Sequence, residues 1–258
     1  MNQTARAPGA ALFEAVGVGR RFDDGTEALA SVSLSARSGG FVAILGPSGC
    51  GKSTLLRILA GLDTATAGRV EWSEGPPAKG DVAFVFQEPT LLPWASLWDN
   101  VYLPLRLAGR TRADAAAAVD GAIRLVCLHG FAQARPGQLS GGMKMRASVA
   151  RALVTGPRLL LMDEPFAALD EITRHRLNGD LLELWQRSRV TVVFVTHSVF
   201  ESVFLSQRIA VMAARPGHIL SQLSIAVPHP RSAAFRTSPE YAAYCRQASA
   251  RLGEAMAA

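Results

Sequence analysis

A glycine-rich run that contains a single lysine is the part of this 258-residue sequence best suited to chemistry. Residues 46–54 read GPSGCGKST, which fits the phosphate-binding pattern G-x-x-x-x-G-K-[ST]. The glycines allow backbone N–H groups to approach phosphate oxygens, the Lys52 ammonium can reach the β- and γ-phosphates, and the Ser53 hydroxyl can ligate Mg²⁺. We therefore predict that a nucleoside triphosphate binds at the following residues: Gly46, Pro47, Ser48, Gly49, Cys50, Gly51, Lys52, Ser53 and Thr54.

The flanks of this loop predict a strand before it and a helix after it. Residues 41–45 form an apolar run typical of a buried parallel strand, and Leu55, Leu56, Ile58 and Leu59 recur at helical spacing. A helix N-terminus adds a partial positive charge that favours phosphate. The alternative is a simple glycine-rich turn with an exposed lysine, and the strand and helix on either side argue against it.

Polar side chains follow three further apolar runs where each predicted strand ends, namely Gln87, the pair Asp163 and Glu164, and His197. The runs themselves are residues 81–86, 159–162 and 190–195. Asp163 suits Mg²⁺, held directly or through water, and Glu164 can position or deprotonate a water aimed at the γ-phosphate. A lone Gln or His at a strand end usually hydrogen-bonds a loop. The carboxyl ends of parallel strands meet in one crevice. These three strand ends and the one before Gly46 together therefore favour a catalytic site instead.

A second candidate anion site lies at residues 139–143, where Ser140, Gly141 and Gly142 open a predicted helix. This stretch falls in a predicted helical insertion, at about residues 92–155, and not beside residues 46–54, called here the Lys52 loop. Two phosphate-binding surfaces on one chain suggest a dimer with nucleotide between the copies. An ordinary capped helix start is the alternative, and it fits these five residues taken alone.

Composition indicates a folded protein with a sizeable core, because hydrophobic residues make up 49% and charged residues only 19%. No apolar run approaches 18 residues and the N-terminus has no apolar signal region, so we expect a cytoplasmic location. The three cysteines are scattered and predict neither a disulfide framework nor a zinc site. Net charge is +6, but no basic stripe with interleaved aromatics supports nucleic-acid binding.

Alternating strands and helices predict a mainly parallel sheet. Beside it, short β segments at 12–18, 28–36 and 68–72 predict an antiparallel sheet, and helical patterns fill an insertion at about 92–155. Residues 1–10 are predicted to form a disordered leader. Residues 228–258 form a polar tail with helical potential from 239 to 256, to which the sequence assigns no role.

The order of these motifs resembles that of the ATP-binding subunits of ABC transporters, over residues 12–226. The segments similar to the family's Walker A, Q-loop, signature, Walker B, D-loop and H-loop are, in turn, 46–54, Gln87, 139–142, 159–164, 168–170 and His197. The resemblance implies an α/β P-loop NTPase fold with a RecA-like, mainly parallel sheet core, an antiparallel β subdomain and an inserted α-helical subdomain. It implies one ABC ATPase domain over residues 11–227.

The resemblance also implies ATP and Mg²⁺ as cofactors, and a head-to-tail dimer that brings the signature of one copy to ATP bound by the other. Catalytic roles fall to Glu164, to His197 at the γ-phosphate, and to Gln87, which senses Mg²⁺ and the attacking water. The implied metal ligands are Ser53, Gln87 and Asp163. The residues implied to bind nucleotide besides the Lys52 loop are Phe22, Ser140, Gly141, Gly142 and Asp170. Phe22 would stack on adenine, although an aromatic at a strand end is easily part of a core.

Two stretches, residues 86–94 and 166–174, are similar to importers of the nitrate, sulfonate and taurine group. Importers of pyrimidine-type precursors share much of this pattern. The implied partners are transmembrane permease subunits and, indirectly, a solute-binding protein, with the chain peripheral on the cytoplasmic face of the membrane. Aromatic and leucine side chains at 94–105 suit either a groove for the permease or core packing. Met143 and Ser198 depart from residues common in the family, at positions beside functional ones.

Two other functions are alternatives to this one. A soluble ABC-type ATPase acting on nucleic acid or ribosomes usually carries a long coiled-coil insertion or two fused cassettes, and this sequence has neither. A non-hydrolysing regulatory binder would be favoured by loss of Glu164 or His197, and both are present. We therefore expect an importer ATPase with no nucleic-acid partner.

Overall fold

The computed structural model describes residues 10–257, which divide into two compact units. The first unit combines residues 10–77 with residues 189–257, and the second comprises residues 78–188. Apart from Ala10, the predicted leader lies outside the described residues. No helix within residues 10–257 is both long enough and apolar enough to cross a membrane.

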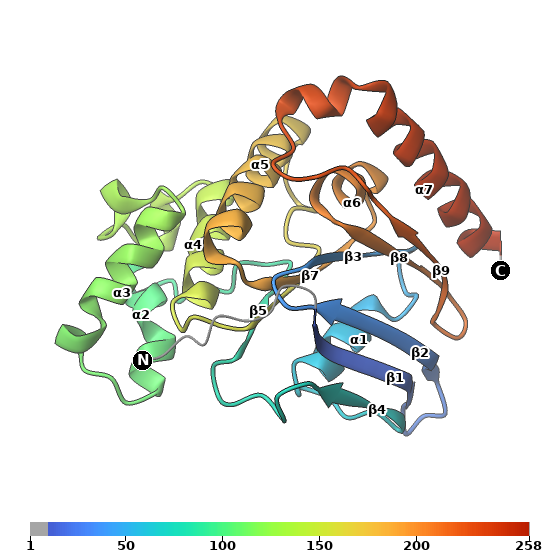
Figure 1. Ribbon diagram of the computed structural model, residues 1–258. Helices are drawn as coiled ribbons and strands as arrows, with labels where there is room; N and C mark the ends of the chain where they lie inside the picture. Colours follow the sequence, from blue (N-terminus) through green and yellow to red (C-terminus); the bar gives the residue numbers. More distant parts are fainter. Residues whose placement is uncertain (1–9, 258) are drawn as a thin grey trace. The chain divides into compact units, whose positions relative to one another are not determined.

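The first unit contains the predicted antiparallel sheet, with strands in the order β2-β1-β4 (Figure 1). Its strands are β1 (Ala11–Arg21), β2 (Glu27–Arg37) and β4 (Ala67–Trp72). Ala15 lies opposite Leu34 on one side and Val70 on the other. The Phe13 ring is fully buried and lies 5.6 Å from the Trp72 ring, centroid to centroid, which anchors the inner face of this sheet.

The first unit also contains four strands of the main sheet, in the order β7-β3-β8-β9. They are β3 (Phe41–Leu45), β7 (Thr191–Thr196), β8 (Arg208–Ala213) and β9 (His218–Ser224). β3 is parallel to both β7 and β8, and β9 pairs antiparallel with β8. Every residue of β3 and β7 is buried, which explains their continuous apolar sequences.

Three helices belong to the first unit, together with the 3₁₀ turn η3 (Ala233–Thr237). They are α1 (Lys52–Leu59), α6 (Val199–Leu205) and α7 (Pro239–Ala257). α1 buries the leucines and isoleucine predicted from helical spacing. It ends at Leu59, and Gly61, just after the capping residue Ala60, adopts φ 68°. α7 packs beside α6, β8 and β9 (Figure 1).

The second unit pairs two parallel strands with four helices. The strands are β5 (Val82–Val85) and β6 (Leu159–Asp163). The helices are α2 (Leu97–Leu107), α3 (Arg112–Leu125), α4 (Gly141–Leu153) and α5 (Glu171–Ser188), with 3₁₀ turns at His129–Phe131 and Pro136–Gln138. Within the predicted helical insertion at about 92–155, α2 and α3 are separate helices, because Gly109 adopts φ 82° and Thr111 caps α3.

The imidazole of His229 in the first unit makes the fold sensitive to acid. Burial and then the positive charge of Arg231 lower the pKa of His229 to about 4, from an ordinary value near 6.5. Between these two pH values the unfolded chain binds a proton that the folded chain does not, so stability falls as pH decreases through that window.

We expect the free energy of unfolding to drop by about 1 kcal/mol more in the parent than in His229→Asn between pH 7 and pH 5, after allowance for the partial exposure of the ring. Urea unfolding of both proteins at both pH values measures the difference. An equal loss in the two proteins would show that His229 does not titrate in this window.

Candidate functional site

The Lys52 side chain lies inside the loop that precedes α1. It is only 5% exposed, and its Nζ donates to the carbonyl oxygens of Gly46 at 3.0 Å and Pro47 at 2.7 Å. The loop backbone therefore holds the ammonium where a phosphate cradle needs its positive charge. The Cys50 side chain is 1% exposed, which favours a loop-filling role for this thiol.

Gly51 directly precedes α1 and adopts φ 89°. A Cβ at this position would lie 2.6 Å from Cδ2 of Leu29 and 2.7 Å from the carbonyl oxygen of Ala28. Gly25 has nearly the same backbone conformation, with φ 86°, but its Cβ would meet no atom within 4 Å. The two glycines thus separate the cost of a left-handed backbone from the cost of a steric clash.

We expect Gly25→Ala to lower the free energy of unfolding by about 1 kcal/mol, through backbone strain alone. Gly51→Ala is expected to lose about 3 kcal/mol, since a clash with backbone adds to the strain. Urea denaturation of both variants measures the difference. Equal losses would show that the Ala28 carbonyl does not restrict this position.

His197 lies beside the phosphate loop at the carboxyl ends of two paired strands of the first unit. Leu45, the last residue of β3, is the register partner of Thr196, the last residue of β7. Gly46 and His197 therefore leave adjacent strands at the same edge of the sheet. His197 is exposed there, as a group that contacts a bound phosphate must be.

Phe22 lies just beyond the end of β1, and its ring is 37% exposed. The guanidinium of Arg20 lies over this ring, 4.8 Å from its centroid, and pairs with Asp63 at 2.9 Å. The ring is therefore held on one side by a cation, and it retains exposed surface on which a base can stack.

The remaining predicted catalytic residues belong to the second unit. Val85 of β5 is the register partner of Met162 of β6, so Gln87, Asp163 and Glu164 all follow the same edge of this parallel pair. Glu164 adopts φ 46°, a left-handed conformation that is strained for a residue with a side chain. Strain of this kind concentrates at functional sites.

The glycine pair that opens α4 lies against the first turn of α5 and the loop before it, within the second unit. A Cβ on Gly142 would lie 3.2 Å from Cγ2 of Thr173, and a Cβ on Gly141 would lie 3.4 Å from Cδ2 of Leu169. Ser140 caps α4, its hydroxyl accepting from the Met143 N–H at 3.3 Å. The structure thus brings the signature and D-loop stretches together.

Asp170 shapes the start of α5. Its carboxylate accepts from the Thr173 N–H at 2.9 Å, and this hydrogen bond lowers the pKa of Asp170. α5 accordingly begins at the next residue, Glu171.

Two arginines that the sequence analysis did not single out fix the loops of this unit. Arg174 donates to the Leu169 carbonyl at 2.8 Å, which braces the loop after Glu164. Arg151 on α4 donates to the carbonyl oxygens of Thr90 at 2.8 Å and Pro89 at 3.0 Å, just after Gln87. Their partners are backbone groups 5 to 62 residues away, and no sequence signal identifies such contacts.

The apolar side chains at 94–105 could either line a groove for the permease or pack in the core, and the structure divides them between these roles. Trp94 is 71% exposed, whereas four others pack inside the second unit, namely Leu97, Trp98, Tyr102 and Leu105. The Trp98 indole N–H donates to Asp120 at 2.8 Å. Core packing therefore accounts for most of this stretch, and Trp94 alone among the five remains available to a partner.

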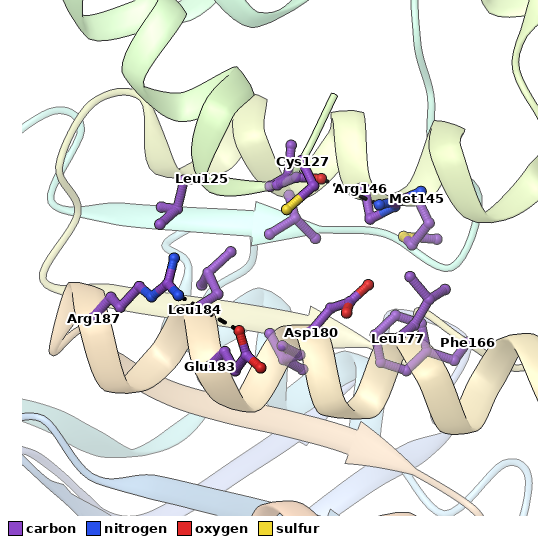
Figure 2. Close-up of a pocket in the computed structure, with 13 residues that line it drawn as sticks. Leu125, Cys127, Met145, Arg146, Phe166, Leu177, Asp180, Glu183, Leu184 and Arg187 are labelled. Atoms are coloured by element: carbon purple, nitrogen blue, oxygen red, sulfur yellow. Dashed lines mark hydrogen bonds and ion pairs between the residues drawn. The ribbon is translucent and has the colours of Figure 1, made fainter. Parts of the chain in front are cut away.

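The second unit also contains a pocket between α4, α5 and the end of α3, which none of the predicted site residues lines. Figure 2 shows Met145 and Arg146 of α4 opposite Leu177 and Leu184 of α5. Arg146 donates to the Val126 carbonyl at 3.4 Å. We assign no nucleotide to this pocket.

Comparison with known proteins places this arrangement in a family. The family model described as ABC transporter matches residues 29–167. An uncharacterised ABC transporter ATP-binding protein of Methanocaldococcus jannaschii is 46% identical, over 84% of this chain and 81% of its own length. The aliphatic sulfonates import ATP-binding protein SsuB 1 of Pseudomonas savastanoi pv. phaseolicola is 44% identical, over 92% of this chain and 95% of its own.

Solved structures agree with these matches. cbiO1 from Clostridium perfringens, part of the ABC transporter complex cbiONQ, superposes with a TM-score of 0.76 at 25% identity, over 83% of this chain and 89% of its own. A dimeric ATP-binding cassette in a post-hydrolysis state, bound to ADP and Pi, gives a TM-score of 0.71 at 29% identity, over 84% of this chain and 100% of its own. The α/β P-loop NTPase fold is therefore confirmed, and this chain belongs to the ATP-binding proteins of the ABC transporter family and is an ATPase.

Proposed function

We propose that this chain is the ATP-hydrolysing subunit of a membrane importer for small solutes of the nitrate, sulfonate and taurine kind. The observation that carries the proposal is the 44% identity with an aliphatic sulfonates import protein over 92% of this chain. A pyrimidine-type precursor is the second candidate solute. We also propose that residues 11–227 form one ATPase domain, with a helical subdomain at about 92–155, followed by a C-terminal tail at 228–258.

In this proposal the nucleotide is held chiefly by the first unit. The Lys52 loop and the N-terminus of α1 bind the phosphates, Phe22 stacks on adenine, and His197 contacts the γ-phosphate. The buried ammonium of Lys52 and the adjacent strand ends of Gly46 and His197 support these roles.

We assign the roles at the attacking water to Glu164 and Gln87. Glu164 positions or deprotonates it, and Gln87 senses its arrival. Ser53, Gln87 and Asp163 offer hydroxyl, amide and carboxylate oxygens, a hard donor set that fits Mg²⁺. Bound Mg²⁺ would neutralise charge on the β- and γ-phosphates.

A second copy of the chain completes the site. Ser140, Gly141, Gly142 and Asp170 would approach ATP bound by the other copy, and the dimeric state of a related cassette supports this arrangement. Transmembrane permease subunits would bind the pair at the cytoplasmic face of the membrane, with a solute-binding protein acting through them. No observation favours a nucleic-acid partner.

Isolation of the detergent-solubilised complex tests this function. We expect a multi-span membrane protein to co-purify, and ATP hydrolysis in proteoliposomes to rise with taurine, an alkanesulfonate or nitrate plus the solute-binding protein. A hydroxymethylpyrimidine serves as the probe for the second candidate. Co-purification with ribosomes or RNA instead of a membrane protein would contradict the proposal.

A further inference from the structure

The C-terminal segment, defined here as residues 228–257, is built onto helix α6 of the first unit. It comprises η3 and α7, and α7 lies beside α6 (Figure 1). Tyr241, Cys245 and Ala248 of α7 are buried, and the Tyr241 ring meets the Phe235 ring edge to face at 5.1 Å. The segment is thus packed into the unit rather than hanging from it.

Arg231 ties this segment to the carboxyl end of α6. The side chain is 5% exposed, and its Nη1 donates to the carbonyl oxygens of Val203 at 2.7 Å, Phe204 at 3.1 Å and Ser206 at 2.8 Å. Its Nη2 donates to the Val227 carbonyl at 2.8 Å. The last carbonyls of a helix lack partners within the helix, and a cation there also favours the helix dipole. Burial lowers the pKa of Arg231 to about 10, so it stays charged at neutral pH.

Two further contacts hold the rest of α6. The Tyr241 hydroxyl donates to the Phe200 carbonyl at 3.0 Å, in the first turn of α6. The Arg236 guanidinium lies over the Phe204 ring, 3.6 Å from its centroid. The C-terminal segment therefore contacts both the first and the last turn of α6.

α6 in turn fixes the residues on either side of His197. The Glu201 carboxylate, only 6% exposed, accepts from the Thr196 hydroxyl at 2.5 Å. The same Thr196 oxygen accepts from the Ser198 N–H at 2.9 Å. The Ser198 hydroxyl accepts from the Glu201 N–H at 3.3 Å and so caps the helix. These hydrogen bonds connect the residues on both sides of His197 to α6.

We propose that the C-terminal segment positions His197, with Arg231 as its anchoring residue. Arg231 fixes α6, and α6 fixes the turn that presents the imidazole. The inference rests on the proposed role of His197 at the γ-phosphate. The Lys52 loop has its own backbone support, so a loosened segment should slow hydrolysis and leave nucleotide binding nearly unchanged.

Steady-state kinetics of three variants test this inference. Arg231→Met keeps the aliphatic stem and removes every donor, and we expect kcat to fall about tenfold with KM changed less than about twofold. Arg231→Lys, which keeps the charge, should recover part of the loss. Arg251→Met is the matched control, because Arg251 also belongs to the segment but donates to the Gln222 carbonyl of β9 at 3.0 Å. It should retain parental kcat.

A double-mutant cycle with His197→Ala distinguishes positioning from a general structural effect. Release of radiolabelled phosphate from ATP measures the low hydrolysis rate that remains in the His197→Ala proteins. If Arg231 acts through His197, Arg231→Met should slow the His197→Ala protein less than about twofold further. The same tenfold loss in both backgrounds, or a raised KM with unchanged kcat, would overturn the inference.

Two further outcomes are also decisive. Parental kcat in His197→Ala would overturn the proposed role of His197 and this inference with it, whereas a slow His197→Ala with additive losses would overturn this inference alone. If Arg231→Met does not fold, Tyr241→Phe carries the same cycle, since it removes only the hydroxyl that binds the Phe200 carbonyl. A non-additive loss of kcat in that cycle supports the inference, and an additive loss or an unchanged kcat overturns it.

Discussion

Glu164→Gln is expected to bind ATP with nearly parental affinity and to hydrolyse it at least about 100-fold more slowly. The amide has almost the shape of the carboxylate but cannot accept a proton from water. Glu164 follows the carboxyl end of β6 in a strained backbone conformation, with φ 46°, and this supports a task beyond folding. Binding of a fluorescent ATP analogue and release of phosphate measure the two effects separately.

Glu183→Gln is a matched control for this experiment. Glu183 lies on α5 of the same second unit, is exposed, and pairs with Arg187 at 3.6 Å, so the change removes one carboxylate from the surface. Parental hydrolysis is expected, because exposed ion pairs contribute little to stability. Parental turnover in Glu164→Gln itself would show that another group handles the attacking water.

Lys52→Ala is expected to weaken ATP binding by about 100-fold or more. A hydrogen bond that involves a charged group contributes about 1.5–3 kcal/mol, and the ammonium is held within the loop by two carbonyl oxygens. Its removal deletes that charge from the phosphate site and leaves Gly46 and Pro47 without their Lys52 contacts. Calorimetric titration with Mg·ATP measures the affinity.

Lys79→Ala controls for the loss of one positive charge, since Lys79 is exposed and lies outside every predicted motif. It should bind ATP as the parent does. A folded Lys52→Ala protein with parental affinity would contradict the assignment of the loop. Circular dichroism establishes that the variant is folded before the affinities are compared.

Local signals in the sequence predicted most of the elements that carry the site. The apolar runs before Gly46 and His197 are buried strands, and Ser140 caps α4 as its residue type suggested. These features depend on neighbours within a few residues, where periodicity and capping preferences act. The roles of the individual site residues stay predictions, because they concern bound nucleotide.

Long-range contacts could not be predicted in the same way. Helical potential indicated α7, but the docking of the C-terminal segment depends on Arg231 and carbonyl oxygens 25 to 28 residues before it. Every residue type offers such a carbonyl, so no pattern marks it. The stretch around Trp94 and Trp98 shows the same limit, because one of these indoles is exposed and the other is buried.

The most direct test of whether two copies of this chain hold ATP between them is the mass of the Glu164→Gln protein. Light scattering measures this mass with and without Mg·ATP. We expect the mass of one chain without nucleotide and of two chains with it, and no change for the Lys52→Ala, Glu164→Gln double variant. The mass of one chain at saturating bound ATP would contradict it.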